Sequence, residues 1–132
     1  MDKFFIEKRI YYHDTDCGGV VYYANYLKHL EEARTEYCIK KGINLKQLGE
    51  NGIYFVVARV EIDYKASARY GDIVQVTADI SGVRRSALKF YQQILRGSSV
   101  LIQAHTTWVC VNKDFKPISI PHEVKKLLTV ES

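Results

Sequence analysis

Two carboxylates lie close together near the N-terminus, in the segment Asp14-Thr15-Asp16, and glycines follow at positions 18 and 19. An amphipathic helix is predicted to begin directly after these glycines. The start of a helix offers backbone N–H groups without intrahelical partners, together with the positive end of a dipole. A carboxylate beside such groups suits attack on a carbonyl whose oxygen gains negative charge. The residues alone leave a second interpretation open, because Asp14 and Asp16 could simply cap the helix.

Hydrophobic spacing predicts the elements around this segment. Residues 3–12 are rich in aromatic and β-branched side chains, which is typical of a strand. From position 21 to position 41, apolar residues recur at intervals of three and four, which predicts a long helix that Gly42 ends. Asn44 is suited to cap a short helical turn over residues 45–49.

The following part of the chain alternates as strands do. Four strands are predicted, at 53–65, 73–80, 87–95 and 100–112, with turns at 68–72, 81–82 and 96–99. Alternation in the first of them places six side chains on one face: Tyr54, Val56, Ala58, Val60, Ile62 and Tyr64. Pro121 is suited to open a last short helix over 122–128. Because short turns imply antiparallel neighbours, the sequence predicts an α+β fold, in which a curled antiparallel sheet of about five strands surrounds one long central helix.

The composition is that of one globular domain over residues 1–132, with 47% hydrophobic and 26% charged residues. Cys17, Cys38 and Cys110 are odd in number and widely spaced, so we expect no disulfide framework and a reducing cytoplasm. The apolar runs are too short for a signal peptide or a transmembrane segment. A net charge of +4 suits an anionic ligand but does not indicate nucleic acid.

Metal-binding residue types also gather near the motif, at His13, Asp14, Asp16 and Cys17. Neighbouring residues of an extended segment point to opposite faces, so the four cannot all converge on one ion. No HExxH or CxxC motif accompanies them, and we expect neither a metal nor another cofactor. The sequence also lacks a Gly-x-Ser-x-Gly elbow, which disfavours a serine-triad hydrolase.

The segment Asp14-Thr15-Asp16-x-Gly-Gly-Val-Val-Tyr-Tyr-Ala-Asn-Tyr, followed by a helix with Glu-Ala-Arg, resembles the hotdog-fold acyl-CoA thioesterases. The resemblance is to the 4-hydroxybenzoyl-CoA thioesterase type, and especially to the bacterial branch encoded beside the Tol-Pal system. It extends over roughly residues 3–125 and includes Ile62-Asp63-Tyr64 and Gly71-Asp72.

This resemblance implies hydrolysis of acyl-CoA to a free fatty acid and CoA. Asp16 would be the nucleophile or the general base, while Asp14 is expected to have a structural role. The backbone N–H of Tyr23 would polarise the thioester carbonyl, at a position where the branch often has His. Arg84 and Arg85 match a basic pair that contacts CoA phosphates. His13, at the head of the motif, is a further candidate to line the substrate site.

The resemblance also implies a homo-oligomer, in which the arginines could come from the neighbouring subunit. A small curled sheet leaves strand edges that need covering, which favours the same conclusion. Two other functions remain open. One is a non-hydrolytic CoA or acyl-carrier-protein binding partner in phospholipid or envelope metabolism. The other is RNA binding by the ten tyrosines, but these fall largely on core-like positions and no RNA-binding motif occurs. Aliphatic acyl groups are expected rather than hydroxybenzoyl, and one sequence does not define their length.

Overall fold

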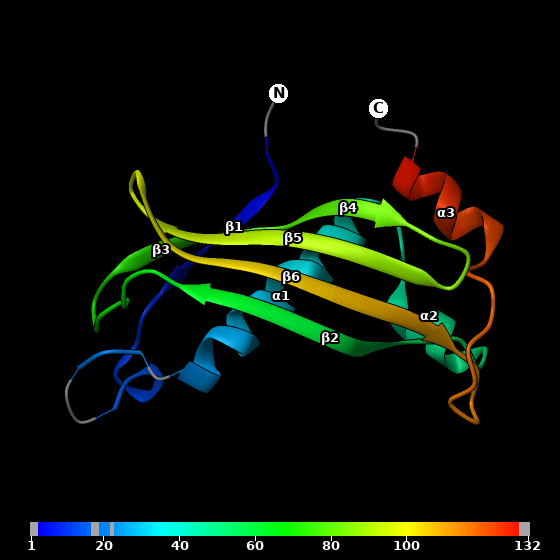
Figure 1. Ribbon diagram of the computed structural model, residues 1–132, viewed down its shortest axis with the longest axis horizontal. Coiled ribbons are helices and arrows are strands. Elements are labelled where there is room, and N and C mark those ends of the chain that lie inside the picture. The colour runs from blue at the N-terminus through cyan, green and yellow to red at the C-terminus, as the bar shows by residue number, and fades with distance from the viewer. Residues whose placement is uncertain (1–2, 17–18, 22, 130–132) are drawn as a thin grey trace.

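The computed structural model describes residues 3–16, 19–21 and 23–129, except for the side chains of Tyr23 and Thr129. One curved antiparallel sheet lies against one long helix, as the sequence predicts (Figure 1). In chain order the elements are β1 (Phe5–Arg9), the short 3₁₀ helix η1 (Tyr12–Asp14), α1 (Tyr23–Lys40), α2 (Leu45–Glu50), β2 (Tyr54–Tyr64), β3 (Ile73–Thr77), β4 (Asp79–Val83), β5 (Ala87–Arg96), β6 (Ser99–Val111) and α3 (His122–Thr129).

The sheet has six strands where about five were expected. Its main path is β1-β3-β5-β6-β2, β4 also pairs with β5, and these pairs are antiparallel. β5 and β6 form a hairpin in which Arg96 faces Ser99, which confirms the predicted turn over 96–99. The order leaves β1 and β2 at the two ends of this path. Figure 1 shows α1 across one face of the sheet, with α3 at the end where β6 finishes.

The strand predicted over 73–80 is in fact two strands, β3 and β4. The break predicted at Ser81 and Gly82 is wrong, because both residues lie inside β4. The pairing register with β5 shifts at this point, and the Ser81 hydroxyl donates to the Lys89 carbonyl at 3.2 Å. A β-bulge therefore accommodates two turn-forming residues without ending the strand.

A second β-bulge changes the faces of β2. The register between β2 and β6 shifts just after Val57, so the predicted alternation does not continue across this point. Val57 stands opposite Trp108 and Val60 stands opposite Thr106. Both partners contact Arg34 of α1, so both face the helix. Val60 therefore lies on the same face as Val57. The prediction that it shares a face with Tyr54 and Val56 is wrong.

Helix α1 buries the stripe that the three-and-four spacing predicts: Tyr26, Leu30, Ala33, Tyr37 and Cys38. It ends where Gly42 adopts a φ of 89°, a conformation that side chains rarely allow. The Ile43 N–H then bonds to the Cys38 carbonyl at 2.9 Å, which confirms the predicted end of the helix. The cap predicted at Asn44 is also confirmed, since its side chain accepts the Gln47 N–H at 3.0 Å.

A buried polar pair connects α1 to the middle of the sheet. The Arg34 Nη1 atom donates to Gln92 Oε1 at 2.9 Å. The Gln92 Nε2 atom donates in turn to the carbonyls of Leu30 and Thr77, each at 3.0 Å. Burial lowers the pKa of Arg34, which the nearby Glu31 opposes. These bonds fix the helix relative to the strands, because breaking any of them would leave a buried polar group without its partner.

Several tyrosines lie on the surface, although the sequence predicts that most tyrosines occupy core-like positions. Five tyrosines are at least 40% exposed, so the prediction of core-like positions is wrong for them: Tyr11, Tyr12, Tyr54, Tyr64 and Tyr70. Within the part of the chain that the structure describes, no helix is long and apolar enough to cross a membrane.

Candidate active site

Asp16 lies in a tight hairpin that leads directly into α1. Thr15 and Val21 form an antiparallel bridge at its base. The Asp16 N–H donates to the Val20 carbonyl, and the Asp16 carbonyl accepts the Gly19 N–H, both at 3.0 Å. Gly19 has a φ of 79°, which the tight return of the chain requires and glycine permits. The Asp16 side chain is exposed on this hairpin.

The hairpin is attached to the turn between β2 and β3. The Val21 N–H donates to the Ala68 carbonyl at 2.9 Å, and the Tyr70 N–H donates to the Gly19 carbonyl at 3.0 Å. The Ala68 N–H donates to the hydroxyl of Tyr26, which comes from the first turn of α1, at 2.9 Å. The hairpin, the helix and the turn over 68–72 therefore form one connected unit.

Asp72 closes that turn. Its Oδ2 atom accepts the Arg69 N–H at 2.9 Å and the Arg96 Nη1 atom at 2.7 Å. Partial burial raises the pKa of the Asp72 carboxyl, but the bonds and charge of Arg96 and Arg69 outweigh burial and lower the pKa. The turn that supports Asp16 is thus held by an ionised carboxylate, which pairs with Arg96 at the end of β5.

The two carboxylates of the motif have different surroundings. Asp14 is only 2% exposed, and its Oδ2 atom accepts the Tyr11 N–H at 2.9 Å across η1. Its carbonyl accepts the Asn25 side-chain amide at 2.9 Å. Asp14 is therefore used within the fold, whereas Asp16 reaches the surface.

The first turn of α1 follows the hairpin at once. Tyr23 is the first residue of the helix, so its N–H belongs to the group that an α-helix leaves without intrahelical partners. The Tyr23 side chain and the motif residues Cys17, Gly18 and Tyr22 lie outside the described residues. The backbone arrangement combines an exposed carboxylate with helix-terminal donors, which suits a reaction that passes through an oxyanion.

Aromatic side chains surround the entrance to this hairpin. His13 is largely exposed, its ring stacks on Tyr11 at 5.7 Å, and its Nδ1 atom lies 3.7 Å from Asp14 Oδ1. Tyr12 meets Tyr70 edge to face at 5.8 Å. His13 could be chosen as a site candidate because it is next to the motif in the sequence. The packing of the 68–72 turn against the hairpin could not, because it is a contact between distant segments.

Arg84 and Arg85 lie far from Asp16 in the folded chain. Both are exposed in the turn between β4 and β5, where the Arg85 carbonyl accepts the Ile120 N–H. The hairpin of Asp16 is attached at the other end of β5, near Arg96. Ten strand residues separate the two ends, which corresponds to about 30 Å. Figure 1 shows these regions at opposite ends of the molecule.

His29 is a residue near the site that the sequence patterns described above do not single out. It is 2% exposed and lies near Asp14. Burial lowers the pKa of His29, although the neighbouring Asp14 carboxylate opposes this effect. A signal was available, because His29 lies three residues after Tyr26 and four before Ala33 on the buried stripe of α1.

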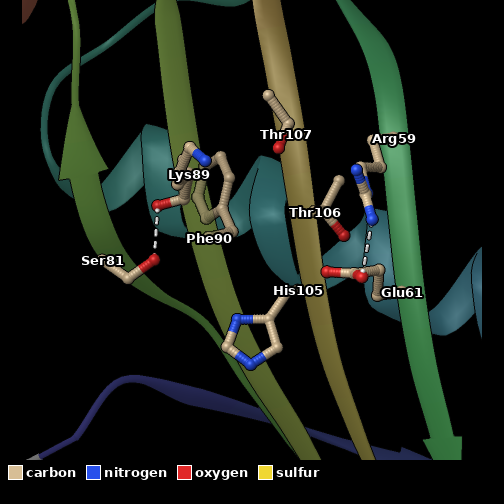
Figure 2. A pocket seen from close by; sticks show the side chains of 8 residues that line it. All are labelled: Arg59, Glu61, Ser81, Lys89, Phe90, His105, Thr106 and Thr107. Carbon is tan, nitrogen blue, oxygen red and sulfur yellow. Dashed lines mark hydrogen bonds and ion pairs between the residues drawn. The ribbon is translucent and has the colours of Figure 1, made fainter.

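A hollow of about 360 Å³ lies on the face of the sheet away from α1 (Figure 2). Arg59 and Glu61 form an exposed ion pair there at 2.8 Å, and Lys89 and His105 line the same hollow. Exposed pairs of this type contribute little energy. None of the described residues of the Asp16 hairpin lines this hollow.

The described residues contain no group of three or more His, Cys, Asp or Glu side chains that could hold a metal ion. Burial raises the pKa of the Cys38 thiol to about 12, and it also raises the pKa of Cys110. These two thiols therefore remain protonated and are poor ligands and nucleophiles.

Comparison with known proteins identifies the family of this chain. A model described as the thioesterase-like superfamily matches residues 11–128. Since the match spans most of the sequence, the chain belongs to the thioesterase-like superfamily and has its hotdog fold. It is accordingly a thioester hydrolase.

Two curated relatives cover nearly the whole chain. The acyl-CoA thioesterase YbgC of Haemophilus influenzae is 40% identical over 121 residues, which is 89% of this chain and 88% of the relative. The acyl-CoA thioester hydrolase YbgC of Escherichia coli is 35% identical over 118 residues, which is 88% of each. The resemblance inferred from the motif is thereby confirmed.

Solved structures show the same fold. A probable thioesterase from Bartonella henselae superposes with a TM-score of 0.86 at 31% identity, over 91% of this chain and 100% of that one. A 4-hydroxybenzoyl-CoA thioesterase superposes with a TM-score of 0.87, over 96% of this chain and 99% of that one. Its identity is 22%, so this second likeness concerns the fold alone.

Proposed function

We propose that the protein hydrolyses acyl-CoA thioesters to free fatty acids and CoA, with Asp16 as the catalytic carboxylate. The observation that carries the proposal is the hairpin over 15–21, which leads from the exposed Asp16 into the first turn of α1. The names of the curated relatives support the same substrate class.

The thioester carbonyl would lie between Asp16 and the N-terminal N–H groups of α1. In one route the Asp16 carboxylate attacks the carbonyl carbon, the C–S bond breaks, and CoA leaves as a thiolate. Water then hydrolyses the mixed anhydride. In the other route Asp16 takes a proton from water, and the resulting hydroxide attacks. In both routes the developing oxyanion accepts hydrogen bonds from the helix start, including the Tyr23 N–H.

Replacement of Asp16 tests this assignment. Asp16→Asn removes the charge with little change of shape, and we expect kcat to fall by about 10²–10⁴-fold. This corresponds to about 3–5.5 kcal/mol of activation free energy. Release of free thiol from acyl-CoA measures the rate, and Asp114→Asn, in an exposed turn after β6, is the matched control. Wild-type turnover by the Asp16 variant would refute the proposed function.

Arg84 and Arg85 are proposed to bind the phosphates of a CoA ester whose thioester group lies at the Asp16 site of the partner subunit. Both side chains are exposed cations, and guanidinium groups bind phosphate through strong, often bidentate bonds. The distance of about 30 Å from the Asp16 end of β5 disfavours a shared site within one protomer. A rotation that pairs two β2 edges antiparallel would bring the opposite ends of two protomers together. His13, beside the hairpin, is proposed to line the pantetheine or acyl path.

A complementation experiment tests the contribution of the partner. The double variant Arg84→Ala/Arg85→Ala should raise KM about tenfold or more, with a smaller effect on kcat. Reassembly of equal amounts of this variant and Asp16→Asn should restore about a quarter of the wild-type sites, because about half of the dimers are mixed and each of these has one intact site. Lys3→Ala is the control for loss of an exposed cation. Absence of recovery from verified mixed dimers would assign the arginines to their own protomer.

The acyl group is proposed to be aliphatic. The relatives at 35–40% identity are named for acyl-CoA, whereas the 4-hydroxybenzoyl-CoA thioesterase, which is named for an aromatic substrate, is only 22% identical. Acyl-CoA esters of graded chain length, compared with 4-hydroxybenzoyl-CoA by kcat/KM, test this preference directly. A role beside the Tol-Pal system, with acyl carrier protein as a partner, is part of the same proposal.

A further inference from the structure

His29 is a buried imidazole, and neither of its ring nitrogens has a hydrogen-bond partner among the residues that the structure describes. It is 2% exposed and occupies the stripe by which α1 contacts the sheet. An unsatisfied buried polar group destabilises a fold, so a buried histidine normally directs a ring N–H at an acceptor. The nearest acceptors therefore indicate what the ring does.

Two carboxylates flank the ring. The Nε2 atom lies 3.6 Å from Asp14 Oδ1, and the Nδ1 atom lies 3.8 Å from Glu32 Oε1. Glu32 Oε1 already forms an ion pair with Lys8 Nζ of β1 at 2.6 Å. Asp14 Oδ1 is also approached by His13, whose side chain is 72% exposed. Glu32 Oε1 is also buried without a hydrogen bond, but the Lys8 ammonium compensates its charge, which leaves the nearer Asp14 oxygen as the acceptor for the His29 N–H.

We propose that His29 is a positioning residue, which holds the Asp14 carboxylate through its Nε2–H and so fixes the turn that presents Asp16. The proposal rests on the proposed catalytic role of Asp16. Asp16 follows Asp14 by two residues, and η1 and the hairpin leave little freedom between them. A carboxylate displaced by about 1 Å can lose about 10²-fold in rate.

The same helix holds Asp14 at two points. Asn25, in the first turn of α1, donates to the Asp14 carbonyl at 2.9 Å, while His29 lies one turn further and faces the Asp14 carboxylate. The start of α1 also provides the proposed oxyanion donors. One rigid helix therefore fixes the position of the carboxylate relative to the N–H groups that it must work with.

Burial of the ring favours a neutral imidazole near neutral pH, and the charges around it are of both signs. Asp14 from the motif and Glu32 from α1 face it as anions, and Lys8 from β1 and Lys28 from α1 face it as cations. Burial outweighs these charges and lowers the pKa of His29. A neutral ring has one N–H, and the lysine-paired Glu32 leaves Asp14 as its acceptor.

Two conservative substitutions separate positioning from packing. The amide nitrogen of His29→Gln can occupy the place of Nε2, whereas that of His29→Asn reaches only the place of Nδ1. We expect His29→Gln to keep kcat within about threefold of wild type, and His29→Asn to lower it about tenfold or more, with KM little changed in both. Both substitutions bury an amide, so a pure packing role would lower stability, more for the shorter Asn, without separating the kcat values of the folded variants. Equal kcat values for the two variants would overturn the proposal.

A double-variant cycle tests whether His29 acts through Asp14. His29→Asn should lower kcat about tenfold in the wild type but less than about threefold in Asp14→Asn, where the carboxylate is already absent. His122→Asn, on the exposed start of α3, is the control and should have no effect in either background. Independent, multiplicative effects at positions 14 and 29 would contradict the proposal.

The ring can also be observed without any assay of hydrolysis. We expect ¹⁵N spectra of the wild-type protein at about pH 7.5 to show the Nε2–H tautomer, with a proton shift that moves in Asp14→Asn. A ring protonated on Nδ1 alone would overturn the proposal even if Asp16 is catalytic. Conversely, wild-type turnover by Asp16→Asn would refute the proposed function and leave the Asp14–His29 contact as a separate finding.

Discussion

At the scale of residues, two carboxylates with the same chemistry have opposite surroundings. Asp14 is buried beside His29 and bound to a backbone donor, whereas Asp16 is exposed on the hairpin before α1. Asp14, which stabilises the fold, and Asp16, which is proposed to act on the substrate, are thus only two positions apart in the sequence. The burial of His29 has a consequence for stability that does not depend on catalysis.

Stability should fall in mild acid because of His29. Its pKa is near 6.5 in the unfolded chain and lower in the fold, because burial disfavours the imidazolium. Below about pH 6.5 the unfolded chain therefore takes up the proton first, and stability is lost as pH falls toward the folded pKa, by up to about 1.4 kcal/mol per pH unit. Urea unfolding at several pH values should show a smaller loss in His29→Gln than in the wild type. His122→Gln is the control, and an identical pH dependence of His29→Gln and wild type would contradict this explanation.

At the scale of elements, the contact between α1 and the sheet depends on polar groups as well as on apolar ones. Gln92 of β5 accepts a bond from Arg34 and donates to the carbonyls of Leu30 and Thr77. The packing of Phe90, whose ring centroid lies 4.8 Å from that of Trp108, surrounds this network with apolar side chains. The guanidinium of Arg34 therefore needs Gln92 as an acceptor.

Removal of that acceptor should be severe. Gln92→Leu removes the shorter of two hydrogen bonds to the buried Arg34 cation, and we expect the free energy of unfolding to fall by about 1.5–3 kcal/mol. Gln93→Leu changes the same residue type on the other face of β5 and should alter stability by less than about 1 kcal/mol. Denaturant midpoints of the two variants provide the comparison. Similar losses for both would show that the network does not hold α1 on the sheet.

At the scale of the whole molecule, the edge strand β2 is long and apolar. Val57 is 50% exposed and Val60 is 37% exposed, on the face of the strand turned toward α1. An uncovered edge of this kind favours association with another strand. A second copy of the chain would cover it and would bring Arg84 and Arg85 toward the partner's Asp16 hairpin, as the proposed function requires.

Charge on this edge should separate the subunits. We expect Val60→Asp to give a monomer in sedimentation velocity and to lose at least about tenfold in kcat/KM, because each site would lack the partner's arginines. Leu127→Asp is the control, since Leu127 is 39% exposed on α3, which packs beside β4 rather than on the β2 edge. A wild-type protein that sediments as a monomer at assay concentration would contradict the two-subunit site.

Much of this organisation was predictable because it depends on local patterns. The three-and-four spacing predicts α1 and its end at Gly42, and alternation predicts most of the strands. The Asp-Thr-Asp motif before a helix start predicts the superfamily, which the comparisons confirm. The β-bulges of β2 and β4 escaped prediction, since a bulge depends on the register with a partner strand rather than on the residues of one strand.

The sequence by itself determined the fold class, the reaction class and the short list of candidate residues, because periodicity and a compact motif are properties of neighbouring positions. Only the tertiary structure decided how those residues are distributed in space. Asp14 is buried and Asp16 is exposed, and His29 is buried next to the Asp14 carboxylate. The length of β5 places Arg84 and Arg85 far from the hairpin. These relations depend on which distant segments the sheet and α1 bring together, and spacing along the chain does not encode that directly.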